Sequence, residues 1–599
     1  MNRIEILERL AREKQWDCVV VGGGATGLGV AVDAAARGYR VAILEVADFA
    51  KGTSSKSTKL VHGGVRYLQH GDVMLVLEAL RERGRMKRNA PHLVKDQSFV
   101  ISNYSWWDNI LYLCGLTFYD LLSFGFGYGR SRFISAKKVM DYLPHIARRG
   151  LKGGVVYHDG QFDDARMAVN LAQTCVEHGG AALNRAQVTA ITHGSDGRVD
   201  GVRFKDLETG REYGLKAKCV VNACGVFVDS IMGMDAPEHK PMVVPSQGVH
   251  LVFDKKFLPG DYAMMVPRTS DGRVLFAVPW RDKVVVGTTD IPRPTPELEP
   301  LPLKEEVDFI LNTAARYFET PPRYEDIESV FAGQRPLAAP KSEGKQTKEL
   351  SRGHKIIVSE HKLITITGGK WTSYRRMAED AVDRAIALGL LEPRKRRTRN
   401  LRVHGYRPAP DLADHMYVYG SDEPLVRALA ASGPEMAQPI HEHYPFTAAE
   451  VVWAVREEMA RDVEDVLARR VRLLFMDAAA AVEAAPKVAG IIAAELGRDK
   501  EWERRQVETF TAYAGNYMAG IADVTAVPFC DAVASKTGTH TPTGATAPAA
   551  KTATTVAQTT AETAAQTPAG ATAQTEAQNI VAHAKLSTTA SGQRAAAGK

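Results

Sequence analysis

The stretch that decides the fold is VVVGGGATG at residues 19–27, and an Ala-rich run and a second apolar strand ending at Glu45 follow it. This order predicts a strand, a tight glycine turn, a helix and a second strand. Gly22, Gly24 and Gly27 have the spacing that a dinucleotide pyrophosphate requires at a helix N-terminus. Glu45 stands where a carboxylate accepts hydrogen bonds from a ribose. The pattern predicts dinucleotide binding; the alternative is a glycine turn in an ordinary α/β domain.

Length and composition indicate a globular protein of two or three domains. The chain has 599 residues, of which 45% are hydrophobic and 24% are charged. Its net charge of +6 gives no support to nucleic-acid binding and is compatible with weak attraction to an anionic membrane surface. No uninterrupted apolar run reaches the length of about 18 residues that would span a bilayer.

The six cysteines are scattered and form no C-x-x-C pair. Zinc or iron–sulfur ligation is therefore not predicted, no other metal site is predicted, and a reduced cytoplasmic setting is expected. Glu5, Glu8 and Glu13 mark an N-terminus without an apolar run, so neither a secretory signal nor a transit peptide is expected.

The pattern of residues changes several times along the chain. Alternating apolar residues over 242–290 predict an antiparallel sheet. The strand–glycine–helix order returns near 364–370, and the segment 425–520 has helical periodicity. Residues 532–599 are Ala/Thr/Gln/Pro-rich, with too few large apolar side chains to fold, and are expected to be disordered.

Aromatic and aliphatic residues crowd together in the segment 106–128. The segment is too short and too often interrupted by polar residues to cross a membrane. It predicts either an apolar patch at a membrane interface or a buried helix pair under a substrate domain, and the sequence does not separate the two.

Taken together, the motifs resemble the FAD-dependent, quinone-linked glycerol-3-phosphate dehydrogenases, which belong to the wider D-amino-acid-oxidase-like flavoproteins. The resemblance covers residues 17–525. It rests on residues 22–45, TSS at 53–55, STKLVHGGVRYL at 57–68, DDAR at 163–166, VNACG at 221–225, GTTD at 287–290, GQRPL at 333–337, GGKWT at 368–372 and MARDVEDVLARR at 459–470.

The resemblance implies an α/β fold with a Rossmann-like FAD-binding domain, an antiparallel-sheet substrate domain and a C-terminal helical domain. The expected boundaries are 17–95, 150–235 and 355–392 for the FAD-binding domain, 96–149 and 236–354 for the substrate and membrane-facing domain, and 400–525 for the helical domain.

The implied reaction oxidises sn-glycerol 3-phosphate to dihydroxyacetone phosphate, with hydride passing to FAD and electrons then passing to ubiquinone or menaquinone. The implied location is peripheral, on the inner face of the cell membrane, and a homodimer is expected. The chemistry supports the same residue types, because a phosphate needs cations, best supplied by arginine, and the hydroxyl proton needs a base.

Residue roles follow from the resemblance. The catalytic candidates are His250, Arg335 and Lys370, although each has a plain alternative as a core histidine, a surface arginine or a helix-start lysine. The substrate-binding candidates are Arg66, Tyr67, Thr288 and Arg352. The cofactor-binding candidates are Gly22, Gly23, Gly24, Thr26, Gly27, Glu45, Thr53, Ser54, Ser55, Lys59, Leu60, Gly64, Ala223, Gly225, Gly369, Lys370 and Thr372.

Three other functions remain open at this point. A glycerol-3-phosphate oxidase would pass electrons to oxygen and release peroxide. An amine or amino-acid oxidase on the same fold would be expected to use one carboxylate-binding arginine instead of several cations. A nucleotide-binding scaffold without turnover would leave its flavin unbleached by any small alcohol phosphate.

Overall fold

The computed structural model describes residues 1–65, 68, 71–123, 125–270, 272–338 and 353–518. Three of the predicted substrate ligands, Arg66, Tyr67 and Arg352, lie outside these residues, as does the predicted disordered tail. The described residues belong to the first compact unit of the chain, Met1–Val527.

An eight-stranded sheet carries the glycine turn. Its central path runs β17–β18–β10–β1–β2–β7, and β1 pairs in parallel with both β10 and β2. Every residue of β1 is buried, as expected for a central strand. The strands are β1 (Trp16–Val21), β2 (Val41–Leu44), β7 (Ala181–Leu183), β8 (Ala186–His193), β9 (Val199–Asp206), β10 (Glu212–Asn222), β17 (His354–Val358) and β18 (Ile364–Gly368).

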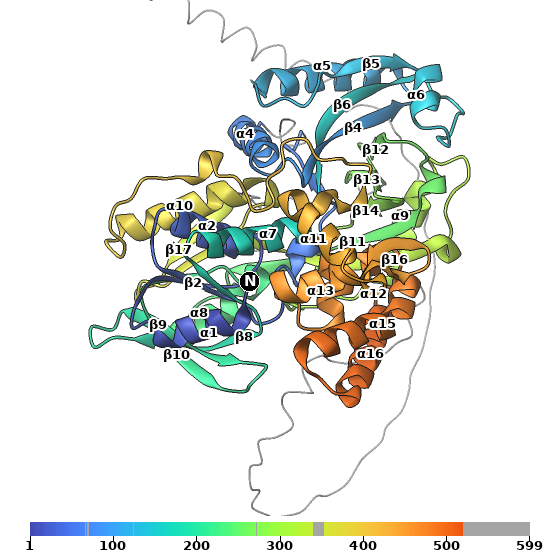
Figure 1. The fold of residues 1–599 in the computed structure, drawn as a ribbon. Coiled ribbons are helices and arrows are strands. Elements are labelled where there is room, and N and C mark those ends of the chain that lie inside the picture. The colour runs from blue at the N-terminus through green and yellow to red at the C-terminus, as the bar shows by residue number, and fades with distance from the viewer. Residues whose placement is uncertain (66–67, 69–70, 124, 271, 339–352, 519–599) are drawn as a thin grey trace, which may run out of the picture. The chain divides into compact units, whose positions relative to one another are not determined.

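Helices pack against this sheet. Helix α2 contacts α7 on one side and α10 on the other, and all three appear together in Figure 1. Strand, glycine turn and helix therefore follow one another as the sequence predicts. The helices of this part of the chain are α1 (Arg3–Arg12), α2 (Ala25–Ala36), α7 (Asp164–Glu177), α8 (Val228–Asp235) and α10 (Tyr374–Ala387).

A second sheet has ten strands and is called the larger sheet below. Its path runs β15–β11–β14–β13–β12–β4–β6–β3, with β16 paired along β11 and β5 paired with β6. The strands are β3 (Leu60–Val61), β4 (Val94–Asn103), β5 (Arg132–Ser135), β6 (Gly153–Phe162), β11 (Val243–Asp254), β12 (Ala263–Val266), β13 (Leu275–Trp280), β14 (Lys283–Gly287), β15 (Ile291–Pro292) and β16 (Ile327–Ala338). The helices beside it are α4 (Val73–Asn89), α5 (Trp106–Leu122), α6 (Ala136–Tyr142) and α9 (Lys304–Ala314).

The predicted domain limits stay a prediction, but the strand pairing bears on them. Strands β3 and β6 belong to the larger sheet, whereas the expected limits assign both to the FAD-binding domain. The reason is that β6 pairs with β4 along its full length, a non-local register that the sequence pattern does not reveal.

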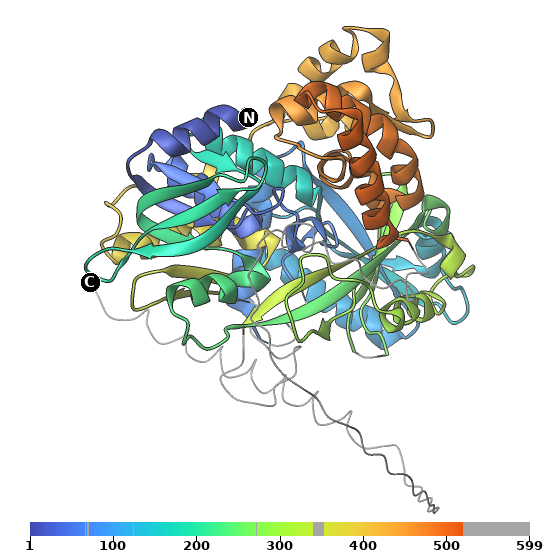
Figure 2. The same ribbon diagram turned by 90° about the horizontal axis from the view of Figure 1, so that it is seen from below.

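The C-terminal helices pack on the larger sheet. Val252, Trp280 and Phe331 of the sheet share one apolar core with Val466 and Leu474 of the helical part. In both views these helices, coloured orange to red, gather beside the green strands (Figure 1 and Figure 2). The elements are α11 (Glu423–Ala430), α12 (Pro434–Ala437), α13 (Ala448–Glu457), a π-helix (Asp465–Arg470), α14 (Leu473–Met476), α15 (Ala478–Leu496) and α16 (Lys500–Gly515).

One short hairpin interrupts this helical region. Strands β19 (Pro439–His441) and β20 (Tyr444–Thr447) pair within the segment for which the sequence predicts helices. Ile440, Tyr444 and Phe446 are buried. Within β20 the buried residues alternate with exposed ones, a pattern too short to stand out from its helical surroundings.

Candidate active site

The glycine turn between β1 and α2 is closed to side chains. Gly22 has φ +105°, and a Cβ at this position would lie 2.9 Å from the carbonyl oxygen of Ala223. A Cβ on Gly27 would lie 1.9 Å from the carbonyl oxygen of Gly22. Gly24 is the N-cap of α2 and carries no side chain over the free N–H groups. This geometry fits a pyrophosphate at the helix N-terminus.

Glu45 follows β2 and lies beside this turn. Its carboxylate accepts hydrogen bonds from the N–H groups of Gly23 (2.5 Å) and Ala47 (2.9 Å). Burial raises the pKa of Glu45, and the two backbone hydrogen bonds oppose that rise. A buried carboxylate at the end of the second strand fits the ribose of a dinucleotide.

The loop Thr53–Ser55 joins three parts of the site. Ser54 Oγ accepts from the N–H of Ala25 at the start of α2 (2.9 Å), and the Thr53 hydroxyl donates to the carbonyl oxygen of Gln334 on β16. The indole of Trp371 donates to the carbonyl oxygen of Ser54 (2.8 Å). The loop thus brings together the helix N-terminus, the neighbour of Arg335 and the neighbour of Lys370.

A network of buried charged side chains fixes the end of this loop at Ser55. Lys59 Nζ donates to Asp164 Oδ2 (2.7 Å) and to the carbonyl oxygen of Ser55 (2.6 Å). Arg472 Nη2 donates to the same carbonyl oxygen and to Asp164 Oδ1, both at 3.0 Å. Burial lowers the pKa of Lys59 to about 7, although Asp164 opposes this. The Lys59 ammonium group is thus engaged by protein groups, and its contact with the cofactor stays a prediction.

Arg335 lies on β16 and is held in place by the larger sheet. Its guanidinium donates to Thr288 Oγ1 (3.0 Å) and to the carbonyl oxygen of Thr289 (3.1 Å), and it pairs with Asp290 (3.3 Å). A Cβ on Gly248 would lie 2.3 Å from Arg335 Nη2, so the glycine provides the space that the guanidinium occupies. The side chain is 26% exposed, which leaves it accessible to an anion.

His250 is two positions beyond Gly248 on β11 and therefore points to the same face of the strand. His250 Nε2 and Thr58 Oγ1 share a hydrogen bond of 2.8 Å, and the ring stacks on Phe331 with centroids 4.9 Å apart. Burial, with the nearby charges of Arg335 and Lys59, holds the pKa of His250 well below its usual value. Its Nδ1 is buried and has no hydrogen-bond partner among the described residues.

Lys370 follows a glycine pair at the end of β18. Gly368 and Gly369 have φ +77° and +75°, and a Cβ on Gly369 would lie 2.4 Å from Met377 Sδ. Lys370 Nζ is buried. Thr372 Oγ1 accepts from the N–H of His62 (3.3 Å), which joins this turn to the loop after β3.

The structure thus brings most of the predicted residues to the glycine turn, the loop 53–55 and the facing strands. The N–H of Ala223 donates to the carbonyl oxygen of Val21 (2.9 Å), which places the end of β10 beside the turn. Gly225, at the start of a short 3-10 helix, and Gly64, in the loop after β3, have φ +59° and +76°. The ligand roles of all these residues stay predictions.

Several residues of the site were not singled out for it by the sequence. Arg472 donates to the carbonyl oxygen of Ser55 and pairs with Asp164. Trp371 donates to the carbonyl oxygen of Ser54, and the carbonyl oxygen of Gln334 accepts from Thr53. The signal for Asp164 lies in the pair Asp163–Asp164, because two adjacent acids at the start of a helix rarely both serve as caps. Arg472 gives no comparable signal, since its partners are remote in sequence.

Comparisons with known proteins agree with this geometry. The FAD dependent oxidoreductase family matches residues 17–375, and the C-terminal domain of alpha-glycerophosphate oxidase matches residues 362–503. The mitochondrial glycerol-3-phosphate dehydrogenase SDP6 of Arabidopsis thaliana is 39% identical over 82% of this chain and 85% of its own length. The mitochondrial glycerol-3-phosphate dehydrogenase of Rattus norvegicus is 36% identical over 85% of this chain and 74% of its own length.

A solved structure is similar along nearly its whole length. The glycerol-3-phosphate dehydrogenase from Bacillus halodurans, complexed with FAD, has a TM-score of 0.72 and 29% sequence identity, with 87% of this chain and 99% of that chain covered. The resemblance noted in the motifs is therefore confirmed. The chain belongs to the family of FAD-dependent glycerol-3-phosphate dehydrogenases.

Proposed function

We propose that this protein oxidises sn-glycerol 3-phosphate to dihydroxyacetone phosphate. FAD, when bound at the glycine turn, supplies the hydride acceptor. The observation that supports the proposal most strongly is the arrangement on β11 and β16, where the guanidinium of Arg335 and the imidazole of His250 share one face. A phosphate and the hydroxyl group next to it require a cation and a base at such close range.

Arg335 is proposed to bind the substrate phosphate. Its fork is oriented by Thr288, Thr289 and Asp290 before any ligand arrives, so little side-chain entropy remains to be lost. Lys370 supplies a second cation from the turn after β18, and the two are linked through the loop 53–55. Each charge-assisted contact to phosphate contributes about 1.5–3 kcal/mol to binding.

His250 is proposed to take the hydroxyl proton. The lowered pKa keeps the imidazole neutral near pH 7, which is the form that accepts a proton. Its buried Nδ1, without a partner among the described residues, is suited to meet a ligand group. A bound phosphate dianion would stabilise the imidazolium that forms, because it places negative charge beside the ring.

We also propose that the protein docks on the inner face of the cell membrane and delivers electrons to a quinone there. The supporting observation is α5, whose outer face carries several exposed apolar side chains, while Leu116 and Tyr119 on its inner face are buried. The exposed large apolar residues of α5 and β5 are Trp106, Trp107, Ile110, Leu111, Phe118, Leu121 and Phe133. Such a patch suits an interfacial helix. Among the described residues, no helix combines the length and the apolar character needed to cross a bilayer.

The reaction is tested by anaerobic reduction of the purified protein. Addition of sn-glycerol 3-phosphate should bleach the visible flavin absorbance, whereas glycerol and amino acids at equal concentration should not. Absence of bleaching by the phosphate would refute the proposed substrate. Re-oxidation by a soluble ubiquinone or menaquinone analogue, compared with peroxide formation in air, separates a dehydrogenase from an oxidase.

Membrane docking is tested separately with the variant W107E/L111E. Sedimentation with vesicles that contain anionic lipid should decrease several-fold, while reduction of the flavin by substrate should be unchanged. Equal sedimentation of variant and wild type would contradict the docking proposal and leave the reaction intact.

A further inference from the structure

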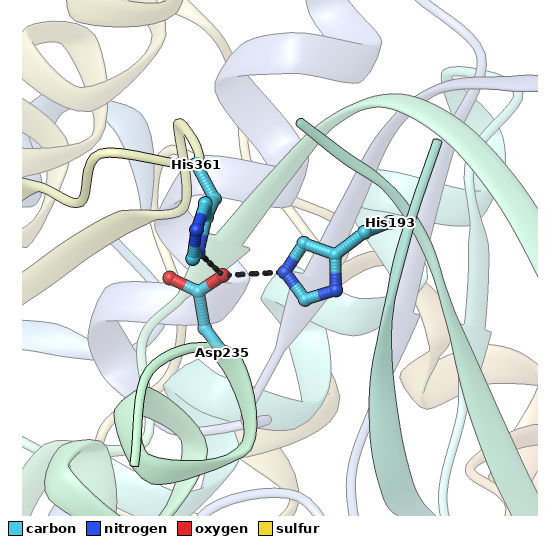
Figure 3. A group of neighbouring side chains, drawn as sticks. All are labelled: His193, Asp235 and His361. Atoms are coloured by element: carbon cyan, nitrogen blue, oxygen red, sulfur yellow. Dashed lines mark hydrogen bonds and ion pairs between the residues drawn. The ribbon is translucent and has the colours of Figure 1, made fainter. Parts of the chain in front are cut away.

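Three side chains converge at the end of the eight-stranded sheet that is remote from the glycine turn. His193 ends β8, Asp235 ends α8, and His361 stands in the turn between β17 and β18 (Figure 3). His361 precedes β18, whereas the glycine turn follows the end of β1, and both strands run parallel to β10. The cluster therefore lies at the amino-terminal ends of these parallel strands, whereas the proposed active site lies at their carboxyl-terminal ends.

The two imidazoles meet on one carboxylate oxygen. His193 Nε2 lies 2.9 Å from Asp235 Oδ1, and His361 Nδ1 lies 3.1 Å from the same atom. The two rings cross at 78° with centroids 5.0 Å apart, and one nitrogen atom of each ring points toward Asp235 (Figure 3). One potential ligand atom from each residue lies within 4.8 Å of the others.

We propose that His193, Asp235 and His361 bind a divalent transition-metal ion, with Zn²⁺ as the reference ion. The sequence predicts no metal site, because it offers no cysteine pair and the three ligands are dispersed along the chain. Two imidazoles and one carboxylate are donors that zinc accepts, and three protein ligands leave one tetrahedral position for water. The same donors suit Co²⁺ and Ni²⁺, which differ in affinity in a known order.

The distances require only a small adjustment. Ligands at 2.0–2.2 Å from a tetrahedral zinc lie about 3.4 Å from one another. The two N–O distances of 2.9 and 3.1 Å are already close to this value. The imidazoles are 30% and 40% exposed, so they can rotate to admit an ion from solvent. In the bound form each neutral ring gives its inward lone pair to the metal and carries its proton on the other nitrogen.

The burial of the carboxylate supports a cationic partner. The Asp235 side chain is only 1% exposed, and the two imidazoles are its hydrogen-bond partners in the part of the chain that the structure describes. A buried carboxylate is costly unless a charge compensates it. A divalent ion held by the same three side chains provides that compensation at neutral pH.

An ion at this position would connect three segments. The end of β8, the end of α8 and the turn before β18 would share one centre, and β18 leads directly to Gly369 and Lys370. We therefore expect binding to stabilise the folded protein, since an ion that binds only the native state shifts the unfolding equilibrium. Binding of an ion at this cluster does not depend on the proposed reaction.

The test uses the full-length, FAD-loaded protein after treatment with a chelator. Titration with Zn²⁺ by calorimetry should show one ion per chain at the cluster, and the midpoint of thermal unfolding should rise. Each of the variants His193→Gln and His361→Gln should weaken binding by at least about tenfold, since even outer partners of metal ligands contribute 10–100-fold. Co²⁺ should give visible absorption bands in the wild type that both variants lose.

A matched control is available in the C-terminal region. His441 and His443 have ring centroids 5.5 Å apart, and His441 Nε2 lies 3.0 Å from Glu483, a carboxylate that is 71% exposed. The variant His441→Gln should leave Zn²⁺ affinity unchanged. Retained flavin absorbance shows that each variant is folded. The proposal is overturned if the wild type shows no saturable Zn²⁺ or Co²⁺ binding, or if His193→Gln and His361→Gln bind as tightly as the wild type.

Discussion

The glycine turn and the proposed phosphate site around Arg335 on the larger sheet are built in different ways. The turn consists of neighbours in sequence, and its geometry depends on atoms that are missing, because a Cβ at Gly22 or Gly27 would overlap backbone oxygen atoms. The site around Arg335 consists of residues that are distant in sequence, and hydrogen bonds and an ion pair hold the guanidinium in position. A side chain added in the turn should therefore abolish FAD binding, whereas substitutions around Arg335 should lower kcat/KM by different amounts.

The largest effect is expected for Gly27→Ala. The new methyl group would lie 1.9 Å from the carbonyl oxygen of Gly22, and this oxygen belongs to the backbone, which cannot rotate away as a flexible side chain could. The purified variant should lack visible flavin absorbance. Gly214→Ala in β10 is the control, because a Cβ there has open space, and it should retain FAD. A yellow Gly27→Ala protein would show that the turn tolerates more than its geometry indicates.

Arg335→Met should affect catalysis and spare the cofactor. Loss of the charged fork from a preorganised site should lower kcat/KM for sn-glycerol 3-phosphate by about 10²–10³-fold. Steady-state kinetics and the flavin spectrum together measure the two properties. Arg376→Met is a control of similar exposure on α10, where the arginine pairs with Asp380 (2.8 Å), and it should change kcat/KM little. Equal losses in both variants would remove Arg335 from the phosphate site.

Gly248→Ala should act through Arg335. The added Cβ would lie 2.3 Å from Arg335 Nη2 and 2.6 Å from Thr288 Oγ1, so the guanidinium must shift by about an ångström. We expect kcat/KM to decrease by about 10–100-fold with FAD retained. In the double variant with Arg335→Met the additional loss should vanish. A full additive loss would mean that Gly248 serves another purpose.

The smallest effect concerns pH. The pKa of His250 is lowered in the folded protein, whereas an unfolded histidine titrates near about 6.5. As the pH decreases through that value, the unfolded chain binds the proton first. The contribution of the neutral imidazole to stability is therefore complete above pH ~6.5 and is lost as the pH falls below it.

His250→Asn tests this contribution. Between about pH 6.5 and 5, the midpoint of thermal unfolding should decrease more in the wild type than in the variant. Parallel curves would show that the folded protein protonates His250 as readily as the unfolded chain does. The activity of the wild type should also have no acid limb from this imidazole above pH ~6.5.

Much of the nucleotide site could be predicted from the sequence, because its contacts are local. The spacing of Gly22, Gly24 and Gly27, and Glu45 at the end of the next strand, follow from a few consecutive turns of backbone. The sequence left open whether the segment 106–128 forms an apolar patch at a membrane interface or a buried helix pair. In the structure most side chains of α5 are not buried, since only Asn109, Leu116 and Tyr119 are buried among its described residues, and contact of its exposed face with a membrane stays a proposal.

The rest depends on register and long-range pairing. Gly248 acquires its purpose only because β11 pairs with β16 so that Ser246 lies opposite Arg335. Arg472 reaches the carbonyl oxygen of Ser55 from a separate region of the chain, and nothing near either residue indicates this. His193, Asp235 and His361 likewise meet only because β8, α8 and the β17–β18 turn end at one edge.

The sequence by itself determined the dinucleotide-binding unit and the family, because a phosphate-binding turn is a property of a few adjacent residues. The tertiary structure alone decided which side chains share a face with Arg335 and which charged side chains hold the loop 53–55. It also decided that His193, Asp235 and His361 form a cluster. The physical reason is that a one-residue change of strand register turns every side chain to the other face of the sheet, and local sequence does not fix that register.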